Sequence, residues 1–92
     1  MIFIETRETG NKVTFRVQGK LAGSGVATLE ECWRTARRHP RARFAVDLTS
    51  VTYIDQAGSL LLQLMDREGV AFVTTGLMTA DVDEMLGRNK KR

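Results

Sequence analysis

Residues whose side chains could act as catalysts are few in this 92-residue chain and stand apart from one another. The sequence has one histidine, His39, and one cysteine, Cys32. A serine or cysteine nucleophile needs a base within hydrogen-bonding distance, and His39 stands beside Pro40 at the expected end of a helix. A metal site needs three or four converging ligands, which no spacing here supplies. We therefore expect no catalytic residue, no metal, no cofactor and no enzymatic activity.

Asp55 is the polar residue with the most informative position. It lies in the stretch VDLTSVTYIDQAGSLLL, at the corner where a strand is expected to lead into a helix. An aspartate at this point can cap the helix, because its side chain accepts hydrogen bonds from free backbone amides and its charge favours the positive end of the helix dipole. Gly58, one turn later, permits a close backbone approach by the core or by a partner.

The composition is that of one folded globular domain. Hydrophobic residues make up 42% of the chain and charged residues 27%, and the single proline argues against a long linker. The N-terminal sequence MIFIETRETG resembles neither a secretory signal nor a membrane span. A lone cysteine cannot form an internal disulfide, which fits a reducing compartment. These features predict a cytoplasmic protein without membrane insertion.

The formal net charge is +3, and its distribution brings nucleic acid into consideration. Cations near the end of a helix are also favoured by the helix dipole without any ligand, so we expect a solvated helix end and tail rather than a nucleic-acid site. The two basic clusters are Arg34, Arg37, Arg38, Arg41 and Arg43 around His39, and Arg88, Lys90, Lys91 and Arg92 at the end of the chain.

Hydrophobic periodicity predicts four strands and three helices. Gly10 and Asn11 tolerate the backbone of a tight turn, so the first two strands should form a hairpin. Val13, Phe15 and Val17 alternate with polar residues, which places one face of the sheet on a core. We expect strands over 2–5, 12–19, 44–48 and 70–75, and helices over 26–38, 57–68 and 80–86, the last one capped by Thr79 and stopped by Gly87.

The predicted helices carry apolar residues on one side. In the first these are Val26, Leu29, Cys32, Trp33 and Ala36; in the second, Ala57, Leu61, Leu64 and Met65 point inward, with Leu60 and Leu62 on the flanks. The parallel strands should be joined by right-handed crossovers. The expected fold is an α/β domain over 1–87 followed by a basic tail over 88–92. Its single-layer, mixed four-stranded β-sheet has an N-terminal antiparallel hairpin, then parallel β-α-β units, with helices packed mainly on one face.

The run VDLTSVTYIDQAG, with FRVQGKL before it and LLLQLM and GVAFVTTG after it, resembles the STAS domain of bacterial anti-sigma-factor antagonists and sulfate-transporter tails. The shared features are Gly-x-Leu after the second strand, Asp-Leu ending the third, and Asp-x-x-Gly opening the second helix. The resemblance covers nearly the whole chain and implies a signalling module in regulation of transcription. It also implies that the last strand and helix of longer members are lacking, and an open sheet edge of this kind favours a homodimer.

The sequence departs from the antagonists at the helix start. There they carry Asp-Ser-Ser-Gly, and the serine before the glycine is phosphorylated; here Ala57 occupies that acceptor position, so we expect no phosphorylation. Ser59 follows the glycine, and we do not expect it to replace the missing phosphate acceptor. The family's Gly-x-Leu-Asp reads Gly19 to Ala22, which removes the acid. The predicted partner-binding residues are Tyr53, Asp55, Gln56, Ala57, Gly58, Ser59 and Leu62.

The principal prediction is a protein-protein interaction module whose partner is an anti-sigma factor, a kinase-like protein or a transporter subunit. One alternative is an accessory STAS subunit of a lipid-transport ABC system, in which the helix opens with Asp-Thr-Ala-Gly; Ala57 and Gly58 match this pattern and Gln56 does not. A second alternative is a nucleic-acid binder that uses the basic clusters. A third, suggested by some family members, is nucleotide binding or hydrolysis.

Overall fold

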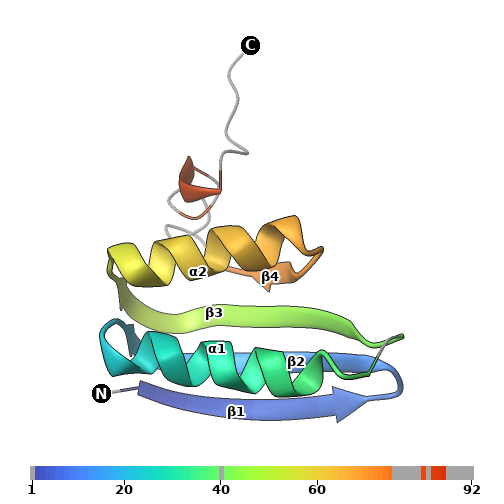
Figure 1. The fold of residues 1–92 in the computed structure, drawn as a ribbon. Coiled ribbons are helices and arrows are strands. Elements are labelled where there is room, and N and C mark those ends of the chain that lie inside the picture. The colour runs from blue at the N-terminus through green and yellow to red at the C-terminus, as the bar shows by residue number, and fades with distance from the viewer. Residues whose placement is uncertain (1, 40, 76–81, 83, 87–92) are drawn as a thin grey trace.

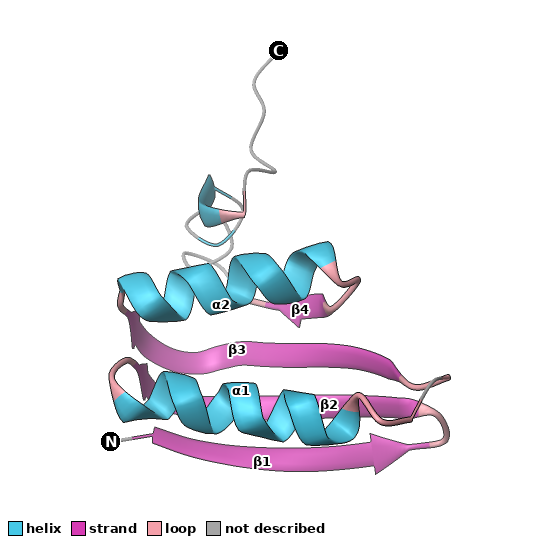
Figure 2. Ribbon diagram, in the orientation of Figure 1, coloured by secondary structure: helices cyan, strands magenta, loops and turns pink. Residues whose placement is uncertain are grey.

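A computed structural model describes residues 2–39, 41–75, 82 and 84–86 (Figures 1 and 2). Its four strands form one sheet in the order β1-β2-β3-β4, in which β1 and β2 are antiparallel and the other pairs parallel. Both helices lie on the same side of this sheet (Figure 1), so the predicted α/β fold class is confirmed. The elements are β1 (Ile2–Thr9), β2 (Lys12–Leu21), α1 (Ser24–Ala36), β3 (Arg43–Ile54), α2 (Gln56–Arg67) and β4 (Ala71–Val73).

The core lies between the sheet and the two helices. The predicted alternation in β2 is confirmed, because Val13, Phe15 and Val17 are buried while Arg16 between them is exposed. Val46 of β3 stands opposite Phe15 in the register, so both point to the helices. The largest fully buried side chains are Phe15, Leu21, Leu29, Leu48, Leu62, Met65, Val17 and Val46. They come from β2, β3 and both helices.

The other face of the sheet carries polar and charged side chains. Arg16 of β2 stands opposite Glu5 of β1 and Asp47 of β3, so a positive side chain lies between two negative ones in a row across the three strands. Burial by itself raises the pKa of Asp47, but hydrogen bonds from the hydroxyl and the amide of Thr49, together with the charge of Arg16, hold that pKa below its ordinary value. Within the described residues no helix covers this face (Figure 2).

Strand β3 is the element whose length differs most from the prediction. It continues from Arg43 to Ile54, well past the expected end at Leu48. The added residues include Thr49, Val51, Thr52 and Ile54, whose β-branched side chains favour a strand. The corner before α2 is therefore a single residue, Asp55. Helix α1 begins at Ser24 and α2 at Gln56, each slightly earlier than predicted.

The predicted helix over 80–86 lies mostly outside the described residues, as do its cap Thr79, its stop Gly87 and the basic tail over 88–92. Of the described residues, Val82 is buried against the core. The Leu86 amide donates a hydrogen bond to the Val82 carbonyl at 2.9 Å. This bond is the i to i−4 bond of one helical turn.

The inward face of α2 was predicted correctly for Leu61 and Met65, which are buried, and wrongly for Ala57 and Leu64. Its buried residues are Gly58, Leu61, Leu62 and Met65, whereas Ala57 is exposed and Leu64 is 42% exposed. Three leucines follow one another at 60–62, so the apolar pattern alone fits more than one rotation of the helix. The face predicted for α1 is confirmed for Val26, Leu29 and Trp33, and Cys32 and Ala36 pack at its margin.

Candidate docking surface at the start of helix α2

Asp55 caps α2, as the sequence predicted, and also binds the turn before α1. Its Oδ1 accepts a hydrogen bond from the Gly58 amide at 2.7 Å, and its Oδ2 accepts one from the Gly23 amide at 3.1 Å. The Asp55 amide donates to the Leu21 carbonyl at 3.2 Å. One side chain thus ties together two turns that are 32 residues apart. Both carboxylate oxygens already have partners inside the chain, so Asp55 acts mainly as a positioning residue.

Gly58 provides the close approach that the sequence suggested, and the approaching group belongs to the core. A Cβ atom at Gly58 would lie 2.6 Å from the Leu21 carbonyl oxygen and 3.0 Å from the Ile54 Cγ2 atom. Because no real side chain tolerates such contacts, only glycine allows α2 to begin this close to β2. Gly58 is buried, so a partner that docks on the surface would not contact it directly.

The prediction that Leu62 contacts a partner is wrong. Its side chain is fully buried in the core between α2 and the sheet, since the helix is rotated relative to the predicted phase. The structure leaves Tyr53 (53% exposed), Gln56 and Ala57 on the surface, with Ser59 partly buried beside them.

Two exposed leucines extend this surface along the helix. Leu60 is 58% exposed and Leu64 is 42% exposed, and they lie four residues apart, on neighbouring turns of one side of the helix. Ala57 lies three residues before Leu60 on the same side. We call Ala57, Leu60 and Leu64 the α2 stripe. The sequence analysis placed Leu64 in the core. The spacing of Gly58, Leu61, Leu62 and Met65, which share one side of the helix, was the signal that could have placed Leu64 on the surface.

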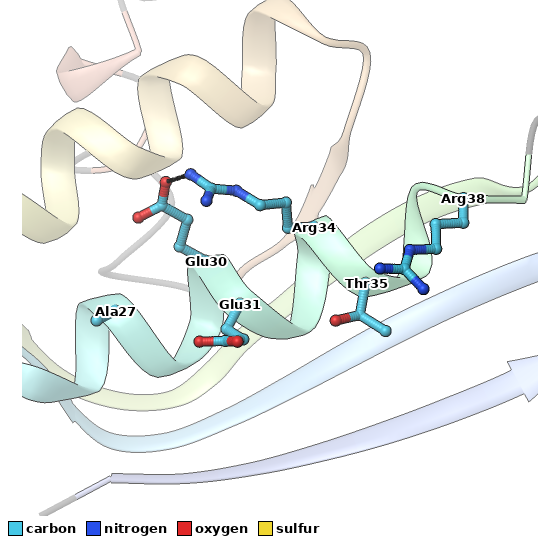
Figure 3. A pocket seen from close by; sticks show the side chains of 6 residues that line it. All are labelled: Ala27, Glu30, Glu31, Arg34, Thr35 and Arg38. Atoms are coloured by element: carbon cyan, nitrogen blue, oxygen red, sulfur yellow. Dashed lines mark hydrogen bonds and ion pairs between the residues drawn. The ribbon is translucent and has the colours of Figure 1, made fainter.

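The outer surface of α1 has a different character. A hollow on this surface is lined by Ala27, Glu30, Glu31, Arg34, Thr35 and Arg38, whose side chains are drawn in Figure 3. Arg34 and Glu30 form an ion pair at 2.6 Å. Arg37 reaches Glu68 at the end of α2, at 3.3 Å, and lies 4.7 Å above the Trp33 ring. Two arginines of the predicted basic cluster are therefore engaged within the chain.

The described residues hold few groups suited to catalysis. Among them, no cluster of three or more histidine, cysteine, aspartate or glutamate side chains could hold a metal ion. No polar or charged residue of the described part is buried. The site residues brought together at the start of α2 are the cap Asp55, the glycine Gly58, the exposed apolar Ala57, and the polar residues Tyr53, Gln56 and Ser59.

Solved structures with the same fold include anti-sigma-factor antagonists. One from Mycobacterium paratuberculosis matches with a TM-score of 0.80 and 16% identity, over 95% of this chain and 79% of that one. The antagonist SpoIIAA in its unphosphorylated form matches with a TM-score of 0.72 and 14% identity, over 89% and 82%. The STAS domain of an antagonist from Rhodobacter sphaeroides matches with a TM-score of 0.55 and 19% identity, over 86% and 90%.

The chain has the fold of a STAS domain, as the sequence resemblance implied. No family model matches the sequence, and a comparison with curated proteins finds no relative. No helix in the described part of the chain is long and apolar enough to cross a membrane.

Proposed function

We propose that this protein is a non-enzymatic STAS module that binds a partner protein through the α2 stripe and the residues beside it, Tyr53 and Gln56. The single observation that carries the proposal is the stripe itself, two leucines 58% and 42% exposed on neighbouring turns of one helix. Exposed apolar residues that lie side by side are typical of interaction sites. The α2 stripe begins at Ala57, which the sequence resemblance assigns to the acceptor position of the antagonists.

The rigidity of the helix start supports the same proposal. Gly58 holds α2 against the Leu21 carbonyl, and Asp55 holds it to the turn at Gly23. A partner would meet a surface that is already in its binding shape, which reduces the entropy lost on association. In this proposal Ala57 provides only a methyl group for contact, so binding is not switched by phosphorylation at that position.

Replacing the leucines tests the proposal. Leu60→Asp with Leu64→Asp places two charges in the α2 stripe while leaving the core intact. We expect the doubly substituted protein to lose its partner in affinity purification from its own cells, and then to bind the purified partner at least about a hundredfold more weakly by calorimetry, since central apolar contacts carry most of an interface's energy. The matched control is Ala27→Asp, an exposed position on α1. Equal recovery of the partner by all three proteins would contradict the proposal.

A charge at the acceptor position gives a second test. Ala57→Glu imitates the charge of a phosphoserine at the start of a helix, where the helix dipole favours an anion. We expect unchanged or slightly greater stability in urea denaturation but weaker partner binding. Ala57→Ser should leave binding unchanged. Normal affinity in the Ala57→Glu protein would place the contact elsewhere.

The identity of the partner separates the remaining alternatives. An anti-sigma factor or kinase-like partner supports an antagonist-like regulator in the cytoplasm, and a transporter subunit supports the accessory role in a lipid-transport ABC system. Binding of duplex DNA that weakens steeply with salt would support the nucleic-acid alternative, and heat on titration with GTP or ATP the nucleotide alternative. In the first two cases the α2 substitutions, and not Ala27→Asp, should abolish binding.

A further inference from the structure

We propose that two copies of this chain pair through the outer edge of β1, antiparallel, with Thr6 of one copy opposite Thr6 of the other. The result is an eight-stranded sheet with a twofold axis near Thr6. This surface is separate from the α2 stripe, so the proposal stands apart from the partner-binding function.

Strand β1 is a long and regular edge. It pairs with β2 over all eight residues, from Ile2 opposite Gly19 to Thr9 opposite Lys12, without a shift in register. In an antiparallel pair every second residue directs its amide and carbonyl away from the neighbouring strand, so β1 presents a row of free backbone groups. Proteins usually protect such edges with proline, lysine, a bulge or a very short strand. The residues Ile2–Thr9 contain no proline, lysine or bulge. Charged side chains also protect edges, and β1 carries Glu5, Arg7 and Glu8, so a strand that pairs here must match those charges.

The opposite edge of the sheet carries, within the described residues, a much shorter strand. Strand β4 consists of only three residues, Ala71–Val73, which offers few backbone groups for pairing. The contrast between the two edges points to β1 as the one suited to another strand.

The charges on β1 select a second copy of the same strand as the occupant. Glu5 and Arg7 are both exposed and lie on the same face of the sheet, two residues apart. When Thr6 stands opposite Thr6, Glu5 of each copy stands opposite Arg7 of the other, which creates two complementary pairs. Arg16 of β2 stands opposite Glu5, but neither Glu5 nor Arg7 forms an ion pair with a described residue of its own chain.

Neighbouring registers are less favourable. A shift that places the twofold axis at Glu5 brings Glu5 opposite Glu5, and a shift to Arg7 brings Arg7 opposite Arg7. Like charges directly opposite each other destabilise a strand pair. The charge pattern therefore favours the register centred on Thr6.

Two single substitutions that complement each other test the pairing of charges. Glu5→Lys and Arg7→Glu each create two like-charge pairs in a homodimer. In a mixture of the two proteins, Lys at 5 meets Glu at 7, and the unchanged Arg7 meets the unchanged Glu5. We expect the wild type to sediment at twice the 10.3 kDa of one chain, each variant alone to dimerise about tenfold more weakly or worse, and an equimolar mixture to recover the dimer.

The mixing experiment separates pairing from misfolding, because a variant that fails to fold would not be rescued by its complement. Circular dichroism of each variant confirms the fold. A wild type that stays monomeric up to millimolar concentration would overturn the proposal. So would a dimer that Arg7→Glu leaves unchanged, or variants that do not recover on mixing.

Cysteine cross-linking tests the register. In a Cys32→Ser background, Thr6→Cys places two cysteines directly opposite each other, with Cα atoms about 4.5–5.5 Å apart, within the range that a disulfide spans. Glu5→Cys is the matched control, since its two copies would be diagonal neighbours about 7–8 Å apart. We expect mild oxidation to cross-link Thr6→Cys and not Glu5→Cys. Cross-linking of Glu5→Cys alone, or of neither, would overturn the register.

Discussion

Helices α1 and α2 cover the same side of the sheet and have similar lengths, 13 and 12 residues, yet their outer surfaces differ. The outer surface of α1 carries charged residues such as Glu30, Glu31 and Arg34, two of which pair with each other (Figure 3). The outer surface of α2 carries Leu60 and Leu64. Because α1 packs on this sheet with a charged exterior, the fold itself does not require the exposed leucines of α2.

The two helices also begin differently. Helix α2 has a side-chain cap, Asp55, whereas no side chain caps α1. The residue before α1 is Gly23, whose φ of 58° lies in the region that glycine adopts without strain. The amide of Gly23 is bound by Asp55, so the start of α1 depends on the residue that caps α2. At this end of the sheet, Asp55 therefore holds the starts of both helices in place.

The largest expected effect separates the inside of α2 from its outside. Leu62→Ala removes a fully buried side chain and should lower the free energy of unfolding by about 2–5 kcal/mol. Leu60→Ala, two residues earlier and 58% exposed, should change it by no more than about 0.5 kcal/mol. Urea denaturation followed by circular dichroism measures both. Similar losses from the two substitutions would show that the rotation of α2 differs from the structure described above.

A smaller effect is expected where the helix starts differ. Asp55→Ala removes the bonds to Gly58 and Gly23 and should lower the free energy of unfolding by about 2 kcal/mol. Asp55→Asn keeps one oxygen acceptor and should cost about half as much. Ser24→Ala, at the uncapped start of α1, should change little. The comparison fails if Ser24→Ala destabilises the protein as much as Asp55→Ala in the same denaturation experiment.

The smallest effect concerns the charged exterior of α1. Glu30→Ala breaks the exposed pair with Arg34 and should lower the free energy of unfolding by about 0.3–0.5 kcal/mol at low salt. The difference from wild type should shrink in high salt, because exposed charges are screened. Thermal denaturation at low and high sodium chloride checks this. A loss that does not depend on salt would mean that Glu30 contributes through packing.

Much of the fold could be predicted from the sequence because its signals are local. The period of two in Val13, Phe15 and Val17 identified β2 and its buried face, and the turn at Gly10 identified the hairpin. The length of β3 was missed, since Thr49–Ile54 does not alternate in hydrophobicity and its extended shape depends on pairing with β2. The β-branched residues in that segment were the available signal.

The candidate site could be predicted only in part. Asp55 was identified as a cap because the rule for helix starts depends on residue type and position alone. Its second bond, to Gly23, joins residues far apart in the chain and has no signal in the sequence. Leu62 and Leu64 exchanged places between surface and core, because a run of three leucines at 60–62 leaves the rotation of a helix undetermined until it packs on a sheet.

The bond between Asp55 and Gly23 has a consequence for how the protein could transmit a signal. The first turn of α2 is joined to the turn before α1 by the Asp55 carboxylate and to the end of β2 by the Asp55 amide. We therefore expect substitutions around Gly23, which is 32 residues from Asp55 in the chain, to shift the start of α2 and so to weaken binding at its surface.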